Sequence, residues 1–146
     1  MKQVSQVDRG MQVIYANHHW VAAACENDEV FVANSLMSSG DISPLVAQQL
    51  KQLYAHRLDQ DGKLEVCLVR CMQQPNLDDC GVYATAFVFE WATNTVKTDI
   101  DVQFDKANMR QHLIDCLECG EVRPFPKMRT HRPRKVAVRK IRKLVV

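Results

Sequence analysis

The sequence predicts a single α+β domain, because short strand patterns fill its first third and helical patterns dominate its second half. Residues 11–33 hold three short apolar runs separated by polar turn residues, whereas the run from residue 80 to 92 is apolar on nearly every side of a helix. With 146 residues, 47% of them hydrophobic, the chain can build one sizeable core.

The strands are expected in the following order. Residues 11–16 (MQVIYA) predict a first strand. Residues 20–25 (WVAAAC) and 30–33 (VFVA) predict a hairpin around the polar turn 26–29. After the helix described next, the alternating run 64–70 (LEVCLVR) predicts a further strand.

Two helices have clear start signals. Ser43 can cap the first, and Pro44 suits its first helical position. The second begins at Cys80, after Asp79 as a candidate N-cap, and its apolar composition predicts a buried helix.

A third helix is expected from Asp105 to Leu117, ended by Gly120. Its predicted buried face carries Met109, Leu113 and Leu117. Residues 124–126 (PFP) then close the predicted domain, which spans residues 1–126.

Residues 127–146 differ in charge from the rest. They hold 9 of the 19 Lys and Arg residues and no Asp or Glu, so this tail carries +9, whereas residues 1–126 carry −7 from 10 basic and 17 acidic residues. We expect a solvated, flexible tail. Contact with nucleic-acid phosphates or a nuclear import signal is the alternative, although no aromatic residue is present in the tail to stack on bases.

The expected location is intracellular, because no secretory signal follows the N-terminus and no apolar run reaches the roughly 20 residues of a membrane span. A nuclear location is included in this expectation. In a reducing compartment, the 6 cysteines are better interpreted as thiols, ligands or nucleophiles than as disulfides. Cys67 with Cys71 and Cys116 with Cys119 have spacings that suggest zinc. Nothing in the pattern brings the two pairs together, so we predict no metal.

Residues 73–84 (QQPNLDDCGVYA) carry the strongest chemical signal. They place Cys80 at the start of the buried helix, where free N–H groups and the helix dipole stabilise a thiolate. Gly81 permits close approach of another chain, and Gln74 is a candidate donor to an oxyanion beside the Cys80 N–H. The alternative is an inert buried cysteine.

A cysteine nucleophile needs an imidazole base and a group that orients this base. His19 stands at the start of one hairpin strand and Asn34 at the end of its partner, so the two can be neighbours. His18 is the competing base and is expected to be exposed. Taken alone, a histidine before a tryptophan on a strand is more often structural than catalytic.

Three short motifs, in this order along the chain, resemble those of the SUMO-protease (ubiquitin-like-protein protease) family. They are HW at His19–Trp20, NSL at Asn34–Leu36 and QPNLDDCG at Gln74–Gly81. The resemblance runs from about Gln12 to Pro126. The closing stretch MRQHLIDCLECGEVRPFP is similar to the ends of transposon-encoded members of the family.

The resemblance implies a papain-like fold and cleavage of a peptide or isopeptide bond after the C-terminal Gly-Gly of a ubiquitin-like modifier, without a cofactor. It makes Cys80 the nucleophile, His19 the general base and acid, Asn34 the residue that orients His19, and Gln74 the oxyanion donor.

The same resemblance implies a substrate channel. Trp20 would wall the passage for the Gly-Gly tail, and Gly81 and Asn76 are also expected to bind substrate. A planar indole can cover an extended chain, and narrow apolar walls admit only glycines.

The chain departs from the family pattern in two respects. Asn34 stands where the family usually has Asp, although an amide oxygen also accepts an imidazole N–H. Only 18 residues precede His19, which implies an N-terminally truncated domain. A catalytically inactive module that binds a modifier or another partner is the alternative function, and acyl transfer on a similar Cys-His plan is a third possibility.

Overall fold

The computed structural model describes residues 10–36, 42–93, 100, 102–128 and 142–146. They form a five-stranded sheet in the order β1-β2-β3-β4-β5. The strands are β1 (Gly10–Ala16), β2 (His19–Glu26), β3 (Glu29–Ala33), β4 (Glu65–Leu68) and β5 (Arg142–Val145). The helices are α1 (Pro44–Leu53), the short 3-10 turn η1 (Ala55–Arg57), α2 (Cys80–Thr93) and α3 (Lys106–Cys119). The α+β prediction is confirmed.

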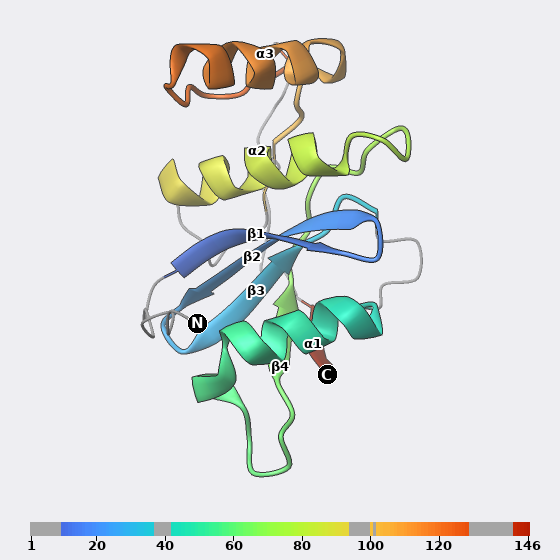
Figure 1. Ribbon diagram of the computed structural model, residues 1–146, viewed down its shortest axis with the longest axis vertical. Coiled ribbons are helices and arrows are strands. Elements are labelled where there is room, and N and C mark those ends of the chain that lie inside the picture. Colours follow the sequence, from blue (N-terminus) through green and yellow to red (C-terminus); the bar gives the residue numbers. More distant parts are fainter. Residues whose placement is uncertain (1–9, 37–41, 94–99, 101, 129–141) are drawn as a thin grey trace, which may run out of the picture.

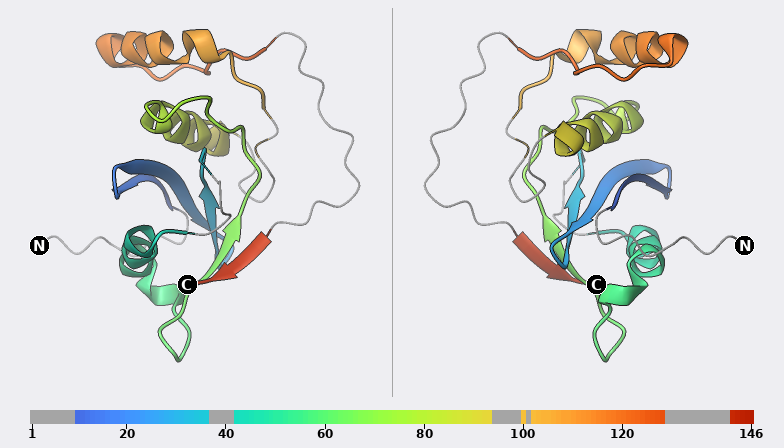
Figure 2. Two further views of the ribbon diagram at one scale, coloured as in Figure 1. Left: turned by 90° about the vertical axis from the view of Figure 1, so that its right-hand side faces the viewer. Right: turned by 90° about the vertical axis from the view of Figure 1, so that its left-hand side faces the viewer.

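The layers follow from the connections. Helix α2 covers one face of the sheet with α3 stacked beyond it, and α1 lies on the opposite face (Figures 1 and 2). Neighbouring strands are antiparallel except β3 and β4, which are parallel and joined through α1. The three strands at the N-terminal end thus form two successive hairpins against which α2 packs.

Both hairpins turn through two residues with positive φ. Asn17 and His18 have φ of 54° and 57°, and Asn27 and Asp28 have 48° and 68°. Asn and Asp tolerate this left-handed conformation better than most residues, and such turns match the twist of the flanking strands. The first turn makes His19 the opening residue of β2, opposite Ala16.

Alternation along the strands divides the core in two. In β2, Ala22 and Ala24 join the cluster under α2, whereas Val21, Ala23 and Cys25 join the cluster under α1. Since successive side chains of a strand point to opposite faces, a sheet covered on both sides is apolar at every position. This explains why WVAAAC shows no polar alternation.

The first two helices begin where the sequence predicts. The Ser43 hydroxyl accepts the Val46 N–H, and Pro44 occupies the first turn of α1. Helix α2 begins at Cys80, and the Asp79 carbonyl accepts the Tyr83 N–H, which gives Asp79 the backbone role of an N-cap. Among the described residues, no helix has both the length and the apolarity to cross a membrane.

The third helix differs from the prediction at one position. Gly120 ends α3 in the left-handed conformation, as expected, and Met109 is buried. Leu117, however, is 74% exposed, and Cys116 occupies the buried position in the last turn. Leu117 was therefore wrongly placed in the core.

The prediction of a flexible tail is wrong for its last residues. Residues 142–145 form β5, which pairs antiparallel with β4 and places Lys143 opposite Cys67. Lys127 forms an ion pair of 3.0 Å with the buried Glu90, so the start of the tail is also held to the domain. Residues 129–141 lie outside the described part, and the domain boundary at residue 126 stays a prediction.

Candidate active site

His19 and Asn34 meet as the hairpin geometry predicts. The imidazole Nε2 of His19 lies 2.6 Å from Asn34 Oδ1, and the same oxygen accepts the Leu36 N–H at 2.9 Å. A backbone N–H can only donate, so the atom facing it is the amide oxygen. His19 Nε2 must then carry the proton, and Nδ1 is the basic nitrogen. Asn34 therefore fixes both the tautomer and the ring orientation.

Cys80 is the first residue of α2 and is 6% exposed. The N–H groups in the first turn of a helix have no partner within the helix and, with the helix dipole, favour a thiolate. Among the described residues, no hydrogen bond joins Cys80 to the His19 ring. Catalytic hydrogen bonds are often long in unliganded structures and tighten with substrate, so this geometry is compatible with a Cys-His pair.

Gln74 is buried in the loop before α2, and both ends of its side chain are bonded. Its Nε2 donates to the Asn76 carbonyl at 2.6 Å, and its Oε1 accepts the Ser35 hydroxyl. The Gln74 backbone N–H also donates to the Ser35 carbonyl at 3.0 Å. These contacts join the loop to the exit of β3, directly after Asn34.

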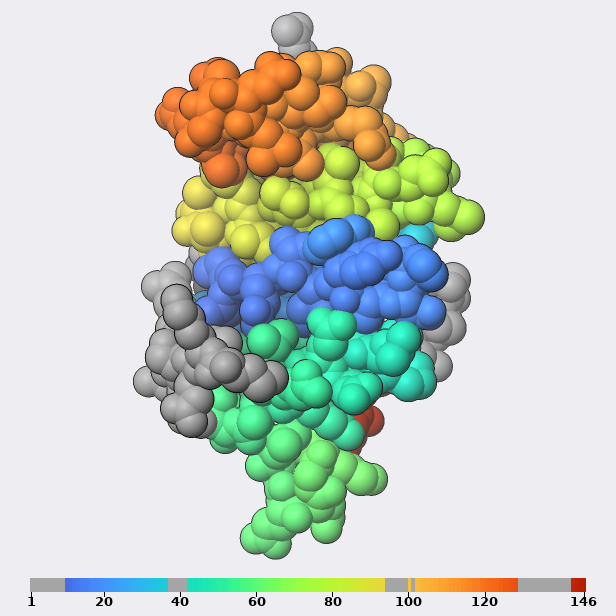
Figure 3. Space-filling model, viewed as in Figure 1, coloured from blue at the N-terminus to red at the C-terminus, as the bar shows by residue number. Residues whose placement is uncertain are grey.

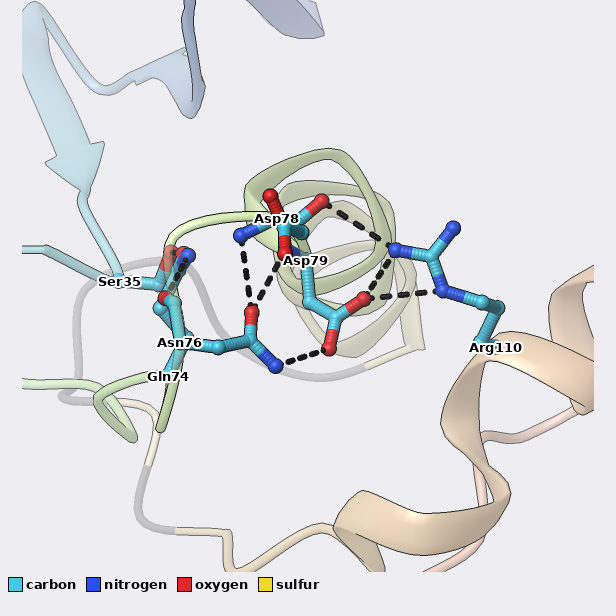
Figure 4. A network of polar contacts seen from close by, with 6 residues as sticks. All are labelled: Ser35, Gln74, Asn76, Asp78, Asp79 and Arg110. Carbon is cyan, nitrogen blue, oxygen red and sulfur yellow. Dashed lines mark hydrogen bonds and ion pairs between the residues drawn. The ribbon is translucent and has the colours of Figure 1, made fainter.

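The remainder of the loop is closed by a polar network (Figure 4). Asn76 Oδ1 accepts the N–H groups of Asp78 and Asp79, and its Nδ2 donates to the Asp79 carboxylate at 2.8 Å. Both polar atoms of the Asn76 side chain are thus bonded within the loop. Its predicted contact with substrate stays a prediction, and the structure shows a loop-closing role.

Arg110 of α3 completes this network by binding the Asp79 carboxylate through Nε at 3.0 Å and through a second guanidinium nitrogen. The hydrogen bond from Asn76 and then the hydrogen bond and charge of Arg110 hold the pKa of Asp79 below its usual value, against the opposing effect of burial.

A pocket of about 630 Å³ opens beside Cys80, between β1, the start of β2, the loop before α2, and α3. Figure 3 shows the β1–β2 hairpin (blue) and α2 with its preceding loop (yellow-green) side by side on one face. Trp20 is 39% exposed and lies against Gly81, where a Cβ would be 3.4 Å from the indole. Tyr15 packs on Trp20 with ring centroids 4.6 Å apart. Glycine at position 81 therefore allows the indole to lie close to the backbone of α2.

The pocket also contains residues that the sequence did not indicate. Its wall includes Tyr15, Leu77, Arg110 and Leu113. His18, the competing base, is exposed and lines the pocket, with Nδ1 3.4 Å from the Tyr15 hydroxyl. Within the described part of the chain, no group of three His, Cys, Asp or Glu side chains is placed to hold a metal ion.

Comparison with known proteins gives the same fold. The chain superposes on a structure described as the SUMO protease Ulp1 with its catalytic cysteine oxidised to a sulfenic acid, with a TM-score of 0.53, 20% identity, and coverage of 82% of this chain and 56% of that one. A second structure, a de-sumoylating protease, matches with a TM-score of 0.44, 19% identity, and coverage of 65% and 42%. A search of curated proteins gives no match.

A cysteine at the start of a buried helix and a histidine oriented by an amide are the parts of a cysteine-protease site. Residues 10–120 match the profile of the Ulp1 protease family, C-terminal catalytic domain, and the chain belongs to this family. It spans just over half the length of the first SUMO protease structure that it matches. The family match thereby confirms the resemblance to SUMO proteases that the three sequence motifs indicated.

Proposed function

We propose that this chain acts as a thiol-dependent peptidase or isopeptidase on the bond that follows the C-terminal Gly-Gly of a ubiquitin-like modifier. Two observations carry the proposal: the 2.6 Å contact between His19 Nε2 and Asn34 Oδ1, and the pocket that Cys80 lines at the start of α2. Membership of the protease family and the SUMO proteases among the matched structures support this substrate class.

The chemistry follows from the roles of the atoms. His19 Nδ1 takes the Cys80 proton, and the sulfur attacks the carbonyl carbon of the terminal glycine. The oxyanion accepts the Cys80 N–H and an N–H of Gln74, whose primary amide has two donors, one of them bound to Asn76. The imidazolium then gives its proton to the leaving amine. Water hydrolyses the resulting thioester and restores the thiol.

Selection for glycine is proposed to come from the narrow approach to Cys80. Trp20 lies at contact distance from the Gly81 position, so a substrate chain passing the indole has little room for side chains. The exposed ring of Tyr15 extends the apolar wall beyond Trp20. Two successive glycines fit such a passage because they lack a Cβ.

Turnover of a fluorogenic amide attached to the Gly-Gly end of SUMO, and of other ubiquitin-like modifiers in parallel, tests the proposal. We expect hydrolysis that is lost in Cys80→Ser and in His19→Gln. Cys119→Ser is the matched control, because Cys119 is exposed at the end of α3 and should leave turnover unchanged. Hydrolysis that persists in Cys80→Ser, or that falls equally in Cys119→Ser, would exclude Cys80 as the nucleophile.

A second candidate is a module that binds a modifier without turnover. One observation favours it: within the described residues, the Cys80 thiol has no hydrogen bond to His19. Hydrolysis by the wild-type chain separates the two candidates, whereas Cys80→Ala should retain reversible binding of the modifier in both cases. Binding by the wild-type chain without any hydrolysis would favour the binding module.

A further inference from the structure

We propose that Ser35 is a positioning residue that holds the Gln74 amide in the orientation needed to stabilise an oxyanion. The inference rests on the proposed hydrolase function and goes beyond it by naming a residue outside the Cys80, His19, Asn34 and Gln74 set. It begins from the hydrogen bond between the Ser35 hydroxyl and Gln74 Oε1 (Figure 4).

The direction of the Gln74 amide is set by its partners. The Asn76 carbonyl can only accept, so it must face Nε2, and it does so at 2.6 Å. The oxygen end then needs a donor, which the Ser35 hydroxyl supplies. If that donor is removed, the amide oxygen is left buried without a partner, a state that costs more than the hydrogen bond itself is worth. The side chain is then expected to turn away from the site.

The Ser35 side chain is well placed for this role. Ser35 is 1% exposed, so water cannot easily replace its hydroxyl, and its backbone carbonyl also accepts the Gln74 N–H at 3.0 Å. Residue 35 thus holds residue 74 through both backbone and side chain. Hydrogen bonds shielded from water in this way are directional and hold geometry.

The place of Ser35 directly after Asn34 links the Ser35–Gln74 contact to the orientation of His19. Asn34 orients the imidazole of His19, and the next residue orients the amide of Gln74. Two consecutive residues at the exit of β3 therefore place the base and the oxyanion donor relative to one another. A displacement of this dipeptide would disturb both sides of the reacting carbonyl at once.

A double-mutant cycle tests the proposal through kcat and KM for the SUMO fluorogenic amide. Ser35→Ala should lower kcat about tenfold with little change in KM, a smaller loss than the roughly hundredfold or more expected when an oxyanion donor is removed in Gln74→Ala. In the Gln74→Ala background, Ser35→Ala should change kcat less than about twofold, because the two residues act as one unit. Equal effects of Ser35→Ala in both backgrounds would overturn the proposal.

Ser43→Ala is the matched control, since it also removes one serine hydroxyl bond, at the cap of α1 on the opposite face of the sheet. It should lower stability by the usual effect of a lost cap and leave kcat unchanged. A kcat loss in Ser43→Ala equal to that in Ser35→Ala would assign both losses to general destabilisation and overturn the role of Ser35.

A spectroscopic readout separates this inference from the hydrolase proposal. The side-chain amide protons of Gln74, assigned by NMR, should exchange slowly with solvent in the wild type and fast in Ser35→Ala. This measurement needs no turnover. Absence of hydrolysis in every variant would refute the proposed function, whereas unchanged exchange in Ser35→Ala would refute the hold of Ser35 on Gln74.

Discussion

Replacement of Asn34 by alanine tests the orientation of His19, the proposed base. Asn34 Oδ1 accepts from His19 Nε2 at 2.6 Å and from the Leu36 N–H at 2.9 Å, and alanine removes both bonds. Only the first bond bears on the reaction. A hydrogen bond of this kind contributes about 0.5–1.5 kcal/mol net, which corresponds to a fall in kcat of about two- to twelvefold.

The expected loss is far below the roughly ten-thousandfold effect of enforcing the wrong imidazole tautomer in a catalytic triad, because alanine offers no group that would stabilise that tautomer. Asn34→Asp keeps both acceptor positions and should match or exceed the wild type. The assay is kcat for the SUMO fluorogenic amide, with unfolding free energies measured in parallel because the Leu36 bond is also lost. Unchanged kcat in Asn34→Ala, or an equal loss in Asn34→Asp, would remove Asn34 from the mechanism.

Three further predictions concern stability and reactivity. The pKa of Asp79 is lowered in the folded state, so its charge stabilises the fold above an unfolded carboxyl pKa of about 3.9 and ceases to do so as pH falls through the lower folded value. The stability gap between wild type and Asp79→Asn in urea unfolding should thus shrink below about pH 4, and a gap independent of pH would contradict this. Phe87 is fully buried between aromatic rings, so Phe87→Ala should cost about 3–5 kcal/mol, whereas Leu117→Ala should stay within about 0.5 kcal/mol by the same measurement. Cys67 is buried opposite Lys143 of β5, and burial raises its pKa although the Lys143 charge lowers it, so the expected effect of removing residues 142–146 rests on access to the thiol: iodoacetamide should modify Cys67 several-fold faster, and an unchanged rate would mean that β5 does not cover it.

Much of the fold can be predicted because its signals are local. The turns at residues 17–18 and 27–28, the Ser43 cap with Pro44, and the apolar run from Cys80 each mark a boundary within a few residues of chain. Strand β5 was missed for the opposite reason. Its four residues include Lys and Arg, which are not typical of a strand. Its partner β4 lies more than seventy positions earlier in the sequence, so no local pattern predicts the pairing.

The candidate site likewise contains contacts that local sequence signals predict and contacts that they do not. The His19–Asn34 contact could be expected because a two-residue turn places the ends of neighbouring strands together. Arg110 could not, since α3 reaches the Asp79 loop only through tertiary packing. Ser35 is part of the NSL motif, but the sequence alone gives its hydroxyl no role. That role appears only in the folded chain, where Gln74, 39 positions later, lies against Ser35.

Covalent capture tests the central claim most directly. A SUMO molecule that carries an electrophile at its C-terminal glycine should form an adduct with the chain, and peptide mass spectrometry should place it on Cys80. Formation of the adduct requires the thiolate, the approach walled by Trp20 and space for the Gly-Gly tail, but no positioned water. We expect one adduct per chain, lost in Cys80→Ala and retained in Cys119→Ser. An adduct on any other of the 6 cysteines, or reversible binding with no adduct at all, would contradict the assignment of this site as a cysteine protease centre.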